Sequence, residues 1–553
     1  MARETESDFP RHRGEDHHTE STRTTPDKGN RRLNFRDSTT HDTTLALELP
    51  STEDRARRVS RNRATNKAKR EWIVFALFNM SVSTDDSISS LPDEILGKVL
   101  SLLPTNQAAF TSVLSKRWRN LFHLVDSLDL SDDATAGGDP RGFPDIVEKA
   151  LSLFRNNNNN IKAFSLHCKH KHDSCRVDDW IRTVLQRNSS SFSELCVEGS
   201  AKHIIGTQSF TSNTLVKLTI SHGFCLEYYF PYPPGRVPFP NLKTLSILFS
   251  LGFGIAELYD DLISDWCPVL EELLIQYVPQ SDYGWTVFRR SVAVLNPSVK
   301  RLTVYIPFRC FLDVAHGKVF RTPGLVYLDY SSFVAGLYHV DMSSLVEARL
   351  DLLKEPLLDD VDEDYGDRIL PDVTNLVAGI SNVKTLHLSS ESLEVFHLYC
   401  KSMHVFHKLL TLSFESDKKR GWQVVPLLLN NSPNLETLVI KGLVHGVTDR
   451  CGDACVCIAR KKMERQVCCL STCQVKVLKV LGYGGTSREL NQMKLFLGNL
   501  KCLETVKVGV KAENRRVENN ANKNYQRITN ALTKLSRASS VKSISFDYPL
   551  INH

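Results

Sequence analysis

A short pattern of apolar and polar positions returns along most of this chain. Six-residue segments of the form apolar-x-x-apolar-x-apolar appear as LVKLTI at residue 215, LKTLSI at 242 and VKRLTV at 299. The alternation that ends each segment predicts a short strand with one buried face. Successive segments between 215 and 325 start 27, 28, 29 and 26 residues apart. This spacing predicts repeats whose strands stack into one parallel sheet, because no single strand can bury its apolar side alone.

The segments continue from residue 161 almost to the last residues. Helices or irregular turns are expected to connect the strands and to back the sheet, which makes the predicted fold class α/β. Proline precedes several of the strands, as in FPNLKTL, where it ends the preceding segment. The predicted strand segments start at 161, 192, 215, 242, 270, 299, 325, 345, 383, 409, 435, 475, 503 and 541.

The stretch from Asp86 to Phe122 has a different pattern, which predicts three short helices. Pro104 separates the first helix from the second. The third is expected to bury Trp118 and to leave Arg117 facing water. The apolar positions of the first recur at helical spacing, and they are Ile95, Leu96, Val99, Leu100 and Leu103.

Residues with side-chain oxygens stand at the predicted starts of these helices. Ser90, Thr105 and Ser115 are placed to cap the first, second and third helix. Pro92 is expected in the first turn of the first helix, a position that proline tolerates. Each hydroxyl is expected to accept a hydrogen bond from a free backbone N–H.

Residues 1–84 show neither helical nor strand periodicity. They are polar and charged, so we expect a disordered tail that cannot bury enough apolar surface to offset its ordering entropy. Its basic run, Arg55 to Arg70, is interpreted as a nuclear import signal, a nucleic-acid-binding tail or a solvated linker. The apolar stretch Trp72 to Met80 is nine residues long, whereas a membrane-spanning helix needs about 20. We therefore expect no membrane protein.

Composition narrows the class of protein. The chain has 553 residues, 41% of them hydrophobic and 24% charged, with a net charge of +6. These values are ordinary for a globular protein, and the mild charge does not argue for nucleic acid. The opening MARETESDFPRHRGEDHH is polar where a secretory signal is apolar. We expect a nuclear or cytoplasmic protein whose 14 cysteines are reduced.

Specific motifs identify the helical segment. ISSLPDE (88–94), LPT (103–105) and TSVLSKRWR (111–119) make it resemble the F-box of plant F-box proteins. The repeats, with CPVLEEL and SPNLETL, look like the leucine-rich repeats that follow the F-box there. Val475 to Val510 looks like the FBD-type C-terminal module of that family. The predicted domains are a disordered basic tail (1–84), an F-box (85–130), a leucine-rich-repeat solenoid (131–470) and FBD-type repeats (471–553).

The resemblance implies a function. The F-box would dock on a Skp-type adaptor, which joins it to a cullin and a RING subunit, and the repeats would hold a protein substrate for ubiquitination. The chain itself would be a non-catalytic receptor subunit. The alternatives are a leucine-rich-repeat binding or inhibitor protein without a ligase, and a basic nuclear protein whose tail contacts nucleic acid. The residues expected to divide between the F-box core and the adaptor surface are Leu91, Pro92, Ile95, Leu96, Val99, Leu103, Pro104, Leu114 and Trp118.

The resemblance also implies which of these residues meet the adaptor, namely Leu91, Pro92 and Ile95. For the substrate, the period of two places polar positions of each strand on the face opposite the core. Solenoids generally bind partners on their concave face. Charged and aromatic residues gather in the middle of these columns, and the predicted substrate-binding residues are Arg301, Tyr327, Asp329, Glu347, Arg349 and His387. A merely solvated sheet, with the substrate held by loops, is the alternative.

Three segments could hide other chemistry. The glycines of GYGGT (482–486) resemble a phosphate loop, but the third glycine of the dinucleotide fingerprint is missing, and Thr486 with Glu489 predicts a helix-capping box instead. Six cysteines lie between Cys451 and Cys473 without the paired knuckles of a zinc site, so we expect an inserted loop. The cluster around His167 to Cys175 is interleaved with lysines, as on a solvated loop. We expect no metal, no cofactor and no catalytic residues.

Overall fold

The computed structural model describes the chain from residue 91 to residue 547, with gaps. All described residues belong to one compact unit, Ala46–Pro549. The predicted tail 1–84, its basic run and Leu114 lie outside them. Among the described residues no helix is both long and apolar enough to cross a membrane. The described ranges are 91–113, 115–134, 142–156, 161–186, 192–206, 210–226, 237–249, 262–277, 293–307, 317–354, 370–447, 451–457, 468–511, 518–537 and 541–547.

The first described segment forms the three predicted helices. They are α2 (Asp93–Leu100), α3 (Thr105–Phe110) and α4 (Lys116–Leu121), with 3-10 turns η1 (Thr111–Val113) and η2 (Phe122–Leu124). Ser115 caps α4, because its hydroxyl accepts a hydrogen bond from the Trp118 N–H, as predicted. The other two caps differ: Pro92 and Pro104 occupy the N-cap positions and offer no side-chain oxygen.

The hydroxyl of Thr105 has another role. It accepts a hydrogen bond of 2.7 Å from the backbone N–H of Asp129, which joins α3 to the first strand. The Ser101 hydroxyl accepts in the same way from the N–H of Asp126 at 3.0 Å. The expectation that Thr105 caps α3 was therefore wrong, since this hydroxyl is used to fasten the helices to the sheet.

The helical segment has a small core of its own. Its buried members are Leu96, Leu100, Leu103, Ala108, Trp118, Leu121 and Val125. Gly97 lies where α2 passes η2, and a Cβ there would stand 2.6 Å from the Cβ of Leu124. Only glycine allows this approach without displacement of the backbone. Phe122 packs against both this core and the core of the sheet.

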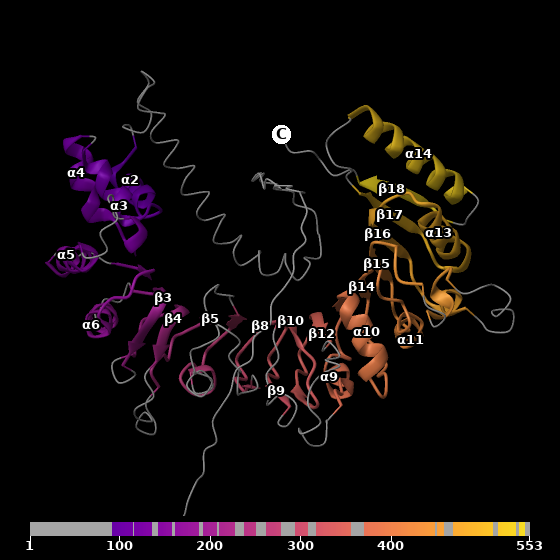
Figure 1. Cartoon of the computed structure of the whole chain (residues 1–553), viewed down its shortest axis with the longest axis horizontal. Helices are drawn as coiled ribbons and strands as arrows, with labels where there is room; N and C mark the ends of the chain where they lie inside the picture. The colour runs from indigo at the N-terminus through magenta and orange to yellow at the C-terminus, as the bar shows by residue number, and fades with distance from the viewer. Residues whose placement is uncertain are drawn as a thin grey trace, which may run out of the picture. The chain divides into compact units, whose positions relative to one another are not determined.

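The repeats form one parallel sheet of fifteen strands that follow one another almost in chain order (Figure 1). Every one of the fourteen predicted segments supplies a strand. The strands are β1 (Ser127–Ser131), β2 (Ala163–Cys168), β3 (Glu194–Ile205), β4 (Lys217–Leu226), β5 (Thr244–Phe249), β6 (Glu272–Tyr277), β8 (Arg301–Ile306), β10 (Tyr327–Phe333), β12 (Glu347–Leu353), β13 (Thr385–Leu388), β14 (Thr411–Glu415), β15 (Thr437–Lys441), β16 (Val477–Tyr483), β17 (Thr505–Val510) and β18 (Ser543–Asp547).

Four strands were not predicted. β1 carries the same template, because Val125, Leu128 and Leu130 stand at the three apolar positions, but its distance to β2 is longer than one repeat. The other three form a separate small sheet in the order β11-β9-β7. They are too short to show an apolar period, and they are β7 (Ala293–Val294), β9 (Lys318–Arg321) and β11 (Tyr338–Asp341).

Helices connect and back the strands on one side of the large sheet (Figure 1). They are α5 (Phe143–Asn156), α6 (Ser174–Leu185), α9 (Thr374–Gly379), α10 (Ser390–Tyr399), α11 (Val425–Asn430), α12 (Cys469–Thr472), α13 (Ser487–Asn499) and α14 (Glu518–Arg537), with 3-10 turns η3 (Asp132–Ala134) and η6 (Gly452–Ala454). The apolar strand positions are buried between the sheet and these connections. Most of the opposite positions near the strand starts are half-buried or exposed, as the period of two predicts. The buried exceptions are Asp129 and Ser413 and, toward the strand ends, Ser221, Leu248, Gln276, Ser331 and Asp351.

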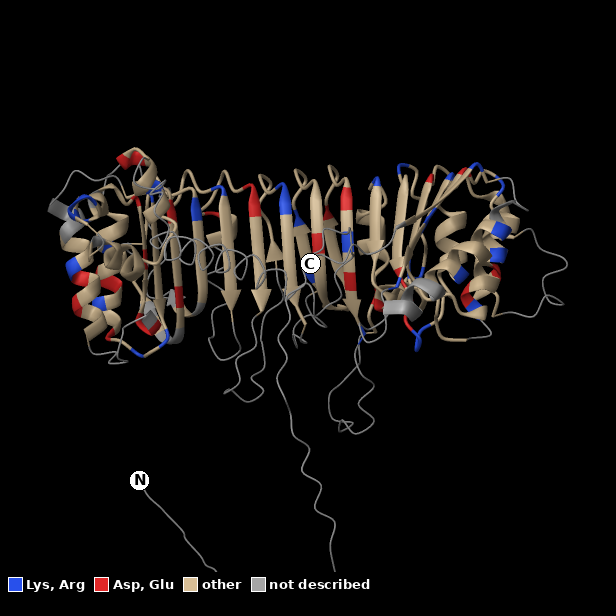
Figure 2. Ribbon diagram, turned by 90° about the horizontal axis from the view of Figure 1, so that it is seen from above, with Lys and Arg blue, Asp and Glu red and all other residues tan. Residues whose placement is uncertain are grey.

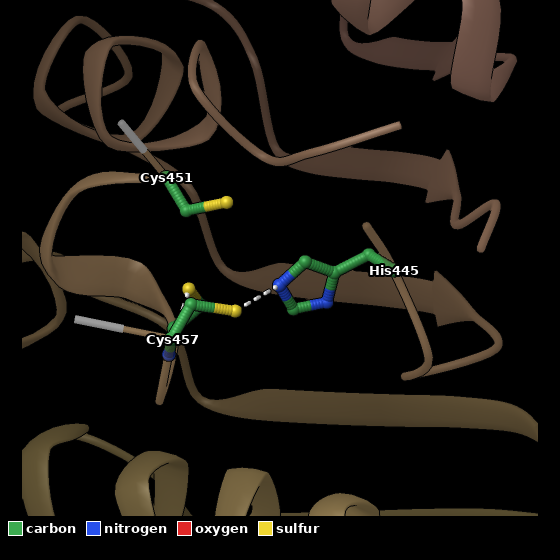
Figure 3. Close-up of side chains that lie close together, drawn as sticks. His445, Cys451 and Cys457 are labelled. Carbon is green, nitrogen blue, oxygen red and sulfur yellow. Dashed lines mark hydrogen bonds between the residues drawn. The ribbon is translucent and has the colours of Figure 1, made fainter. Parts of the chain in front are cut away.

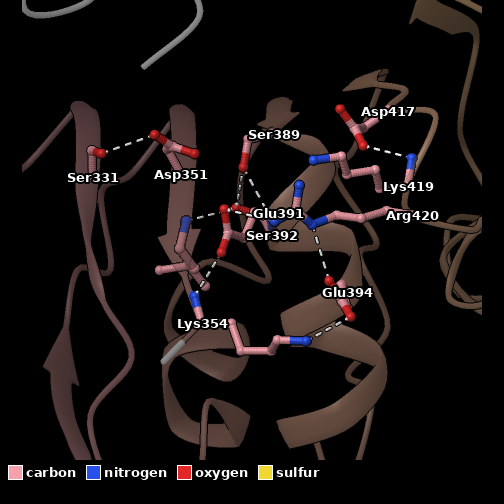
Figure 4. Close-up of polar contacts among 11 residues, drawn as sticks. Ser331, Asp351, Lys354, Ser389, Glu391, Ser392, Glu394, Asp417, Lys419 and Arg420 are labelled. Carbon is pink, nitrogen blue, oxygen red and sulfur yellow. Dashed lines mark hydrogen bonds and ion pairs between the residues drawn. The ribbon is translucent and has the colours of Figure 1, made fainter. Parts of the chain in front are cut away.

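A polar network joins β12 to α10 and to the loop after β14 (Figure 4). The Lys354 ammonium group donates to Glu394 at 2.9 Å, and its backbone N–H donates to Glu391 at 3.0 Å. Arg420 donates to Glu394 at 3.0 Å and lies 3.1 Å from Glu391. Burial raises the pKa of the Glu394 carboxyl, but the hydrogen bonds from Lys354 and Arg420 outweigh burial and leave that pKa below its ordinary value. The Glu394 carboxylate therefore stays ionised near neutral pH.

Candidate functional site

The helical segment divides its predicted contact residues between core and surface. Ile95 is 42% exposed on α2, and Pro92 is exposed at the start of that helix. Leu91 is half-buried against the small core. Val99 and Pro104 are also half-buried. The buried members of the predicted set are Leu96, Leu103 and Trp118.

Further apolar side chains of this segment point to solvent. Leu102 is 52% exposed, Phe110 62% and Val113 80%. Phe110 is the only phenylalanine among the exposed large hydrophobic side chains of the described residues. Several exposed apolar side chains on one small helical domain make that domain a candidate interaction surface. Phe110 is the last residue of α3, and helical periodicity in the sequence gives no sign that its side chain lies on the outer face.

Arg117 holds the start of α2. Its guanidinium group donates to the Asp93 carboxylate at 2.8 Å and also to the carbonyl oxygen of Leu91. Arg117, which we expected to face water, makes these contacts while 37% of its side chain stays exposed. The contact crosses from α4 to α2, so it fixes the position of Pro92 and Ile95 on the surface.

The six residues predicted to bind substrate lie on four adjacent strands. Arg301, Tyr327 and Glu347 stand opposite one another in register on β8, β10 and β12. Asp329, Arg349 and His387 form the next row on β10, β12 and β13. The strands of this sheet lie side by side with charged residues near the starts of the central ones (Figure 2). The structure therefore brings all six onto one face, which is the face away from the core.

Contacts within this group make a continuous chain of charged and aromatic groups. The guanidinium of Arg301 lies over the Tyr327 ring at 4.1 Å, and that of Arg349 lies 5.9 Å from the same ring. Arg349 donates to Glu347 at 2.9 Å. His387 approaches the same carboxylate at 3.5 Å. These pairings fix the side chains before any partner binds.

Burial, and next the nearby Asp329 carboxylate, raise the pKa of the Tyr327 hydroxyl above its ordinary value. The hydroxyl therefore stays protonated at physiological pH and can donate a hydrogen bond. Tyr327 therefore presents an apolar ring next to the guanidinium groups of Arg301 and Arg349, and a hydroxyl that can donate a hydrogen bond. Tyrosine and arginine are the residue types that most often supply binding energy in protein interfaces.

A hollow of about 350 Å³ lies in this part of the sheet face. Arg301, Tyr327 and Asp329 line it, while the other three predicted residues lie on the adjoining strands. The polar lining residues outside the predicted set include Glu272, Gln276, Tyr305 and Ser331. Tyr305 and Ser331 are the next outward-facing positions on β8 and β10. The alternation of inward and outward positions in the sequence could therefore have identified them.

The glycine-rich turn after β16 is occupied by a side chain. The Glu489 carboxylate accepts hydrogen bonds from the N–H groups of Gly484 at 3.0 Å and Thr486 at 2.8 Å. The predicted capping box between Thr486 and Glu489 is confirmed. A bound phosphate would need these same N–H groups. The Glu489 carboxylate therefore caps the start of α13 and occupies the N–H groups that a nucleotide phosphate would use.

The histidines between β2 and α6 gather around one carboxylate. Asp132 lies 3.0 Å from His172 Nε2 and 3.2 Å from His170 Nδ1, and it accepts from the backbone N–H of His170 at 2.8 Å. His167 instead lies 3.2 Å from Asp129. The contacts link β1 to the turn before α6. We read them as structural, because each histidine has an acidic partner.

Comparisons with known proteins agree with these features. The F-box domain family model matches residues 88–130. The F-box/LRR-repeat protein At1g48400 of Arabidopsis thaliana is 46% identical in an alignment of 506 positions that covers 84% of this chain and 99% of that protein. This chain belongs to the plant F-box/LRR-repeat family. The Arabidopsis thaliana F-box protein At4g27050 is 49% identical over 449 residues, 78% of this chain and 94% of its own length. Another relative from that plant, At1g21990, is 54% identical over 471 residues, 83% of this chain and 98% of its own.

Membership of this family identifies the two described parts of the chain. The helices α2 to α4 are the F-box, and the fifteen-stranded sheet is built by the leucine-rich repeats of an F-box/LRR-repeat protein. The strands β16 to β18, which fall in the predicted FBD-type module, pair in register as direct continuations of the sheet. The FBD assignment itself stays a prediction.

Proposed function

We propose that this F-box/LRR-repeat protein is the substrate-recognition subunit of a Skp-cullin-F-box ubiquitin ligase. The F-box docks on a Skp-type adaptor, which joins the protein to cullin and RING subunits, and the sheet face holds the target. The protein contributes binding and positioning, and the ubiquitin transfer belongs to the other subunits. The nucleus and the cytoplasm are the compartments in which we expect it to act.

The observation that carries the proposal is an F-box that folds on its own core and still exposes apolar side chains. Ile95, Leu102, Phe110 and Val113 are each more than 40% exposed. Burial of apolar area is the main favourable term in association between proteins. An adaptor that covers these groups would bury their apolar area while the F-box core beneath them stays folded.

The sheet face supports the second half of the proposal. Its central strands present an aromatic ring, two arginines and two carboxylates whose mutual contacts are already made. A prearranged surface loses less side-chain entropy on binding than a flexible one. The mixed charge and the hollow of about 350 Å³ suit a protein segment that carries a charged and an apolar side chain.

Two measurements test the proposal. Purified full-length protein is first mixed with a Skp-type adaptor, and the expected result is a one-to-one complex on a sizing column. Proximity labelling in plant cells is then carried out with the intact protein and with a version lacking residues 88–124, which keeps β1 and should hold its target without degradation. Proteins enriched by both versions, and more abundant with the truncated one, are the expected targets.

The alternative is a leucine-rich-repeat binding or inhibitor protein that works without a ligase. It predicts no adaptor complex and equal target abundance with both versions. A failure of adaptor binding at micromolar concentrations would therefore reject the ligase proposal. The sheet face would remain a binding surface in that case.

A further inference from the structure

Four side chains after β15 converge on one point. The donor atoms of His445, Cys451, Cys455 and Cys457 all lie within 4.8 Å of one another. Figure 3 shows the side chains of His445, Cys451 and Cys457 turned toward one another. Zinc–sulfur bonds of about 2.3 Å in a tetrahedron place the donor atoms about 3.8 Å apart. Small side-chain movements are therefore enough to close the group around one ion.

The donor set has the composition of a closed structural zinc site. Three thiols and one imidazole supply four ligands, and a structural zinc ion is bound by four such groups without an open position. His445, Cys451 and Cys455 are buried, and Cys457 is half-buried. Water would thus have little access to an ion among them.

The contacts of His445 suit a metal ligand. Its Nδ1 lies 3.1 Å from the Leu443 carbonyl oxygen, which accepts a hydrogen bond only if Nδ1 carries the proton. This leaves a lone pair on Nε2, which points at Cys457 Sγ 3.1 Å away. Metal-binding histidines almost always donate their other N–H to such an oxygen. The ring also stacks on Trp422 at 4.2 Å, which restricts its rotation.

Several donors point at the sulfur atoms. The backbone N–H of Trp422 donates to Cys451 Sγ at 3.4 Å, and the backbone N–H of Cys457 donates to Cys455 Sγ at 3.3 Å. Arg488 on α13 reaches Cys457 Sγ at 3.2 Å. Each of the three sulfur atoms therefore already has a donor that can orient it toward a bound ion.

We propose that His445, Cys451, Cys455 and Cys457 bind one zinc ion, which fixes the loop between β15 and β16 against α13. On binding, three thiols lose their protons to solvent, and the ion with three thiolates carries a net charge of −1. Arg488 offsets that charge. Gln492 of α13 holds the same loop, since it accepts from the Val456 N–H at 3.0 Å and donates to the Ala454 carbonyl oxygen at 2.9 Å.

The spacing of the cysteines concealed this group in the sequence. Cys451, Cys455 and Cys457 supply only three ligands, and the fourth is a histidine six residues before the first of them. The neighbouring group of Asp453, Cys468 and Cys469 supplies only three donor atoms. Its carboxylate also accepts from the Cys469 N–H at 2.6 Å. We therefore use this second group as the control.

The test uses the full-length protein, purified under reducing conditions without added metal. Elemental analysis should find one zinc ion per chain. After removal of metal with a chelator, titration with Co²⁺ should give the intense visible absorption of tetrahedral cobalt–thiolate, saturating at one equivalent. Cys457→Ser and His445→Gln should each lower the Co²⁺ affinity at least 100-fold. Cys468→Ser and Cys502→Ser should leave it unchanged.

A further variant separates ligands from supporting residues. Arg488→Gln keeps all four ligands but removes the charge beside Cys457, so Co²⁺ should still bind one-to-one with an affinity about 10–100-fold lower. Circular dichroism confirms that each variant is folded before titration. A folded wild-type chain without tetrahedral Co²⁺ absorption would overturn the proposal. So would a disulfide between Cys451 and Cys455 in the reduced preparation, or equal loss of affinity in Cys468→Ser.

Discussion

The guanidinium carbon of Arg301 lies 4.1 Å from the centroid of the Tyr327 ring. The two residues are direct neighbours in register on β8 and β10, so the sheet itself sets their distance. A cation over an aromatic face at an exposed site is stabilised by about 0.5–1 kcal/mol. The pair therefore presents a partner with a fixed surface, half aromatic and half cationic, beside the hollow of the sheet.

Removal of this pair should weaken target binding. We expect the double variant Arg301→Ala with Tyr327→Ala to reduce the amount of target recovered by proximity labelling at least tenfold. The reason is that a central tyrosine and arginine in an interface often contribute about 2 kcal/mol or more. Quantitative mass spectrometry of the labelled proteins measures the change.

Lys507→Ala is the matched control for this pair. Lys507 is an exposed residue on the outward face of β17, away from the hollow. Its replacement should leave target recovery unchanged. Equal recovery with the double variant and the wild type would show that the target binds to the loops and not to this part of the sheet.

Charge on the exposed apolar groups of the F-box should prevent adaptor binding. Ile95→Asp with Phe110→Asp places two carboxylates where we expect an apolar contact, and burial of an unpaired charge is strongly unfavourable. The adaptor dissociation constant, measured by calorimetry, should rise at least 30-fold. Both residues are exposed, so the melting temperature of the free protein should change little. Replacement of Leu91 is a poorer test because that side chain also packs against the core.

Ile146→Asp supplies the comparison for this variant. Ile146 is 46% exposed on α5 and thus close in exposure to Ile95, but it lies outside the F-box. We expect normal adaptor binding. If both variants bind the adaptor like the wild type, the docking surface has been assigned to the wrong side chains.

The strand pattern predicted much of this fold, because one apolar period recurs in every repeat. It predicted fourteen of the fifteen strands of the large sheet and placed Arg301 and Tyr327 on the outer face. It could not give contacts between strands, such as the approach of His387 on β13 to Glu347 on β12, because those depend on register. It also gave no account of side chains near helix ends, such as Phe110, whose direction is set by the packing of three short helices.

Gly97 provides a test of the F-box core that does not touch its surface. A valine at this position would place side-chain atoms against Leu124, whose Cβ is 2.6 Å from an ideal Cβ at residue 97. Overpacking of this kind costs about 1–3 kcal/mol. Hydrogen exchange of α2 should accelerate about five-fold or more in Gly97→Val, whereas the strands of the sheet keep their protection.

Gly498→Ala is the corresponding control. A Cβ there meets nothing within 4 Å, and alanine favours the helical conformation of α13 by up to about 1 kcal/mol relative to glycine. We expect equal or greater protection of α13 in this variant. Unchanged exchange of α2 in Gly97→Val would mean that α2 and η2 are not held together as tightly as the structure indicates.

Acid should destabilise the start of the repeat region through His203. This side chain is fully buried, and its Nε2 accepts a hydrogen bond from the His172 N–H at 3.4 Å. Burial, and next the nearby His172, lower the pKa of His203 from 6.5 to about 4. Because the folded state binds this proton less readily than the unfolded state, the stabilisation is complete above pH 6.5 and is lost as the pH falls toward 4. The full shift corresponds to about 3 kcal/mol. Burial raises the pKa of the Asp132 carboxyl, but hydrogen bonds from His170, Lys169 and His172 outweigh burial, so that this pKa is also lowered. Protonation of Asp132 therefore removes further stability below pH 4.

His203→Gln keeps an acceptor for the backbone N–H of His172 without a titrating group. Between pH 7 and pH 5 the melting temperature of the wild type should therefore fall by several degrees more than that of His203→Gln. Parallel pH profiles for the two proteins would show that His203 does not carry this acid sensitivity.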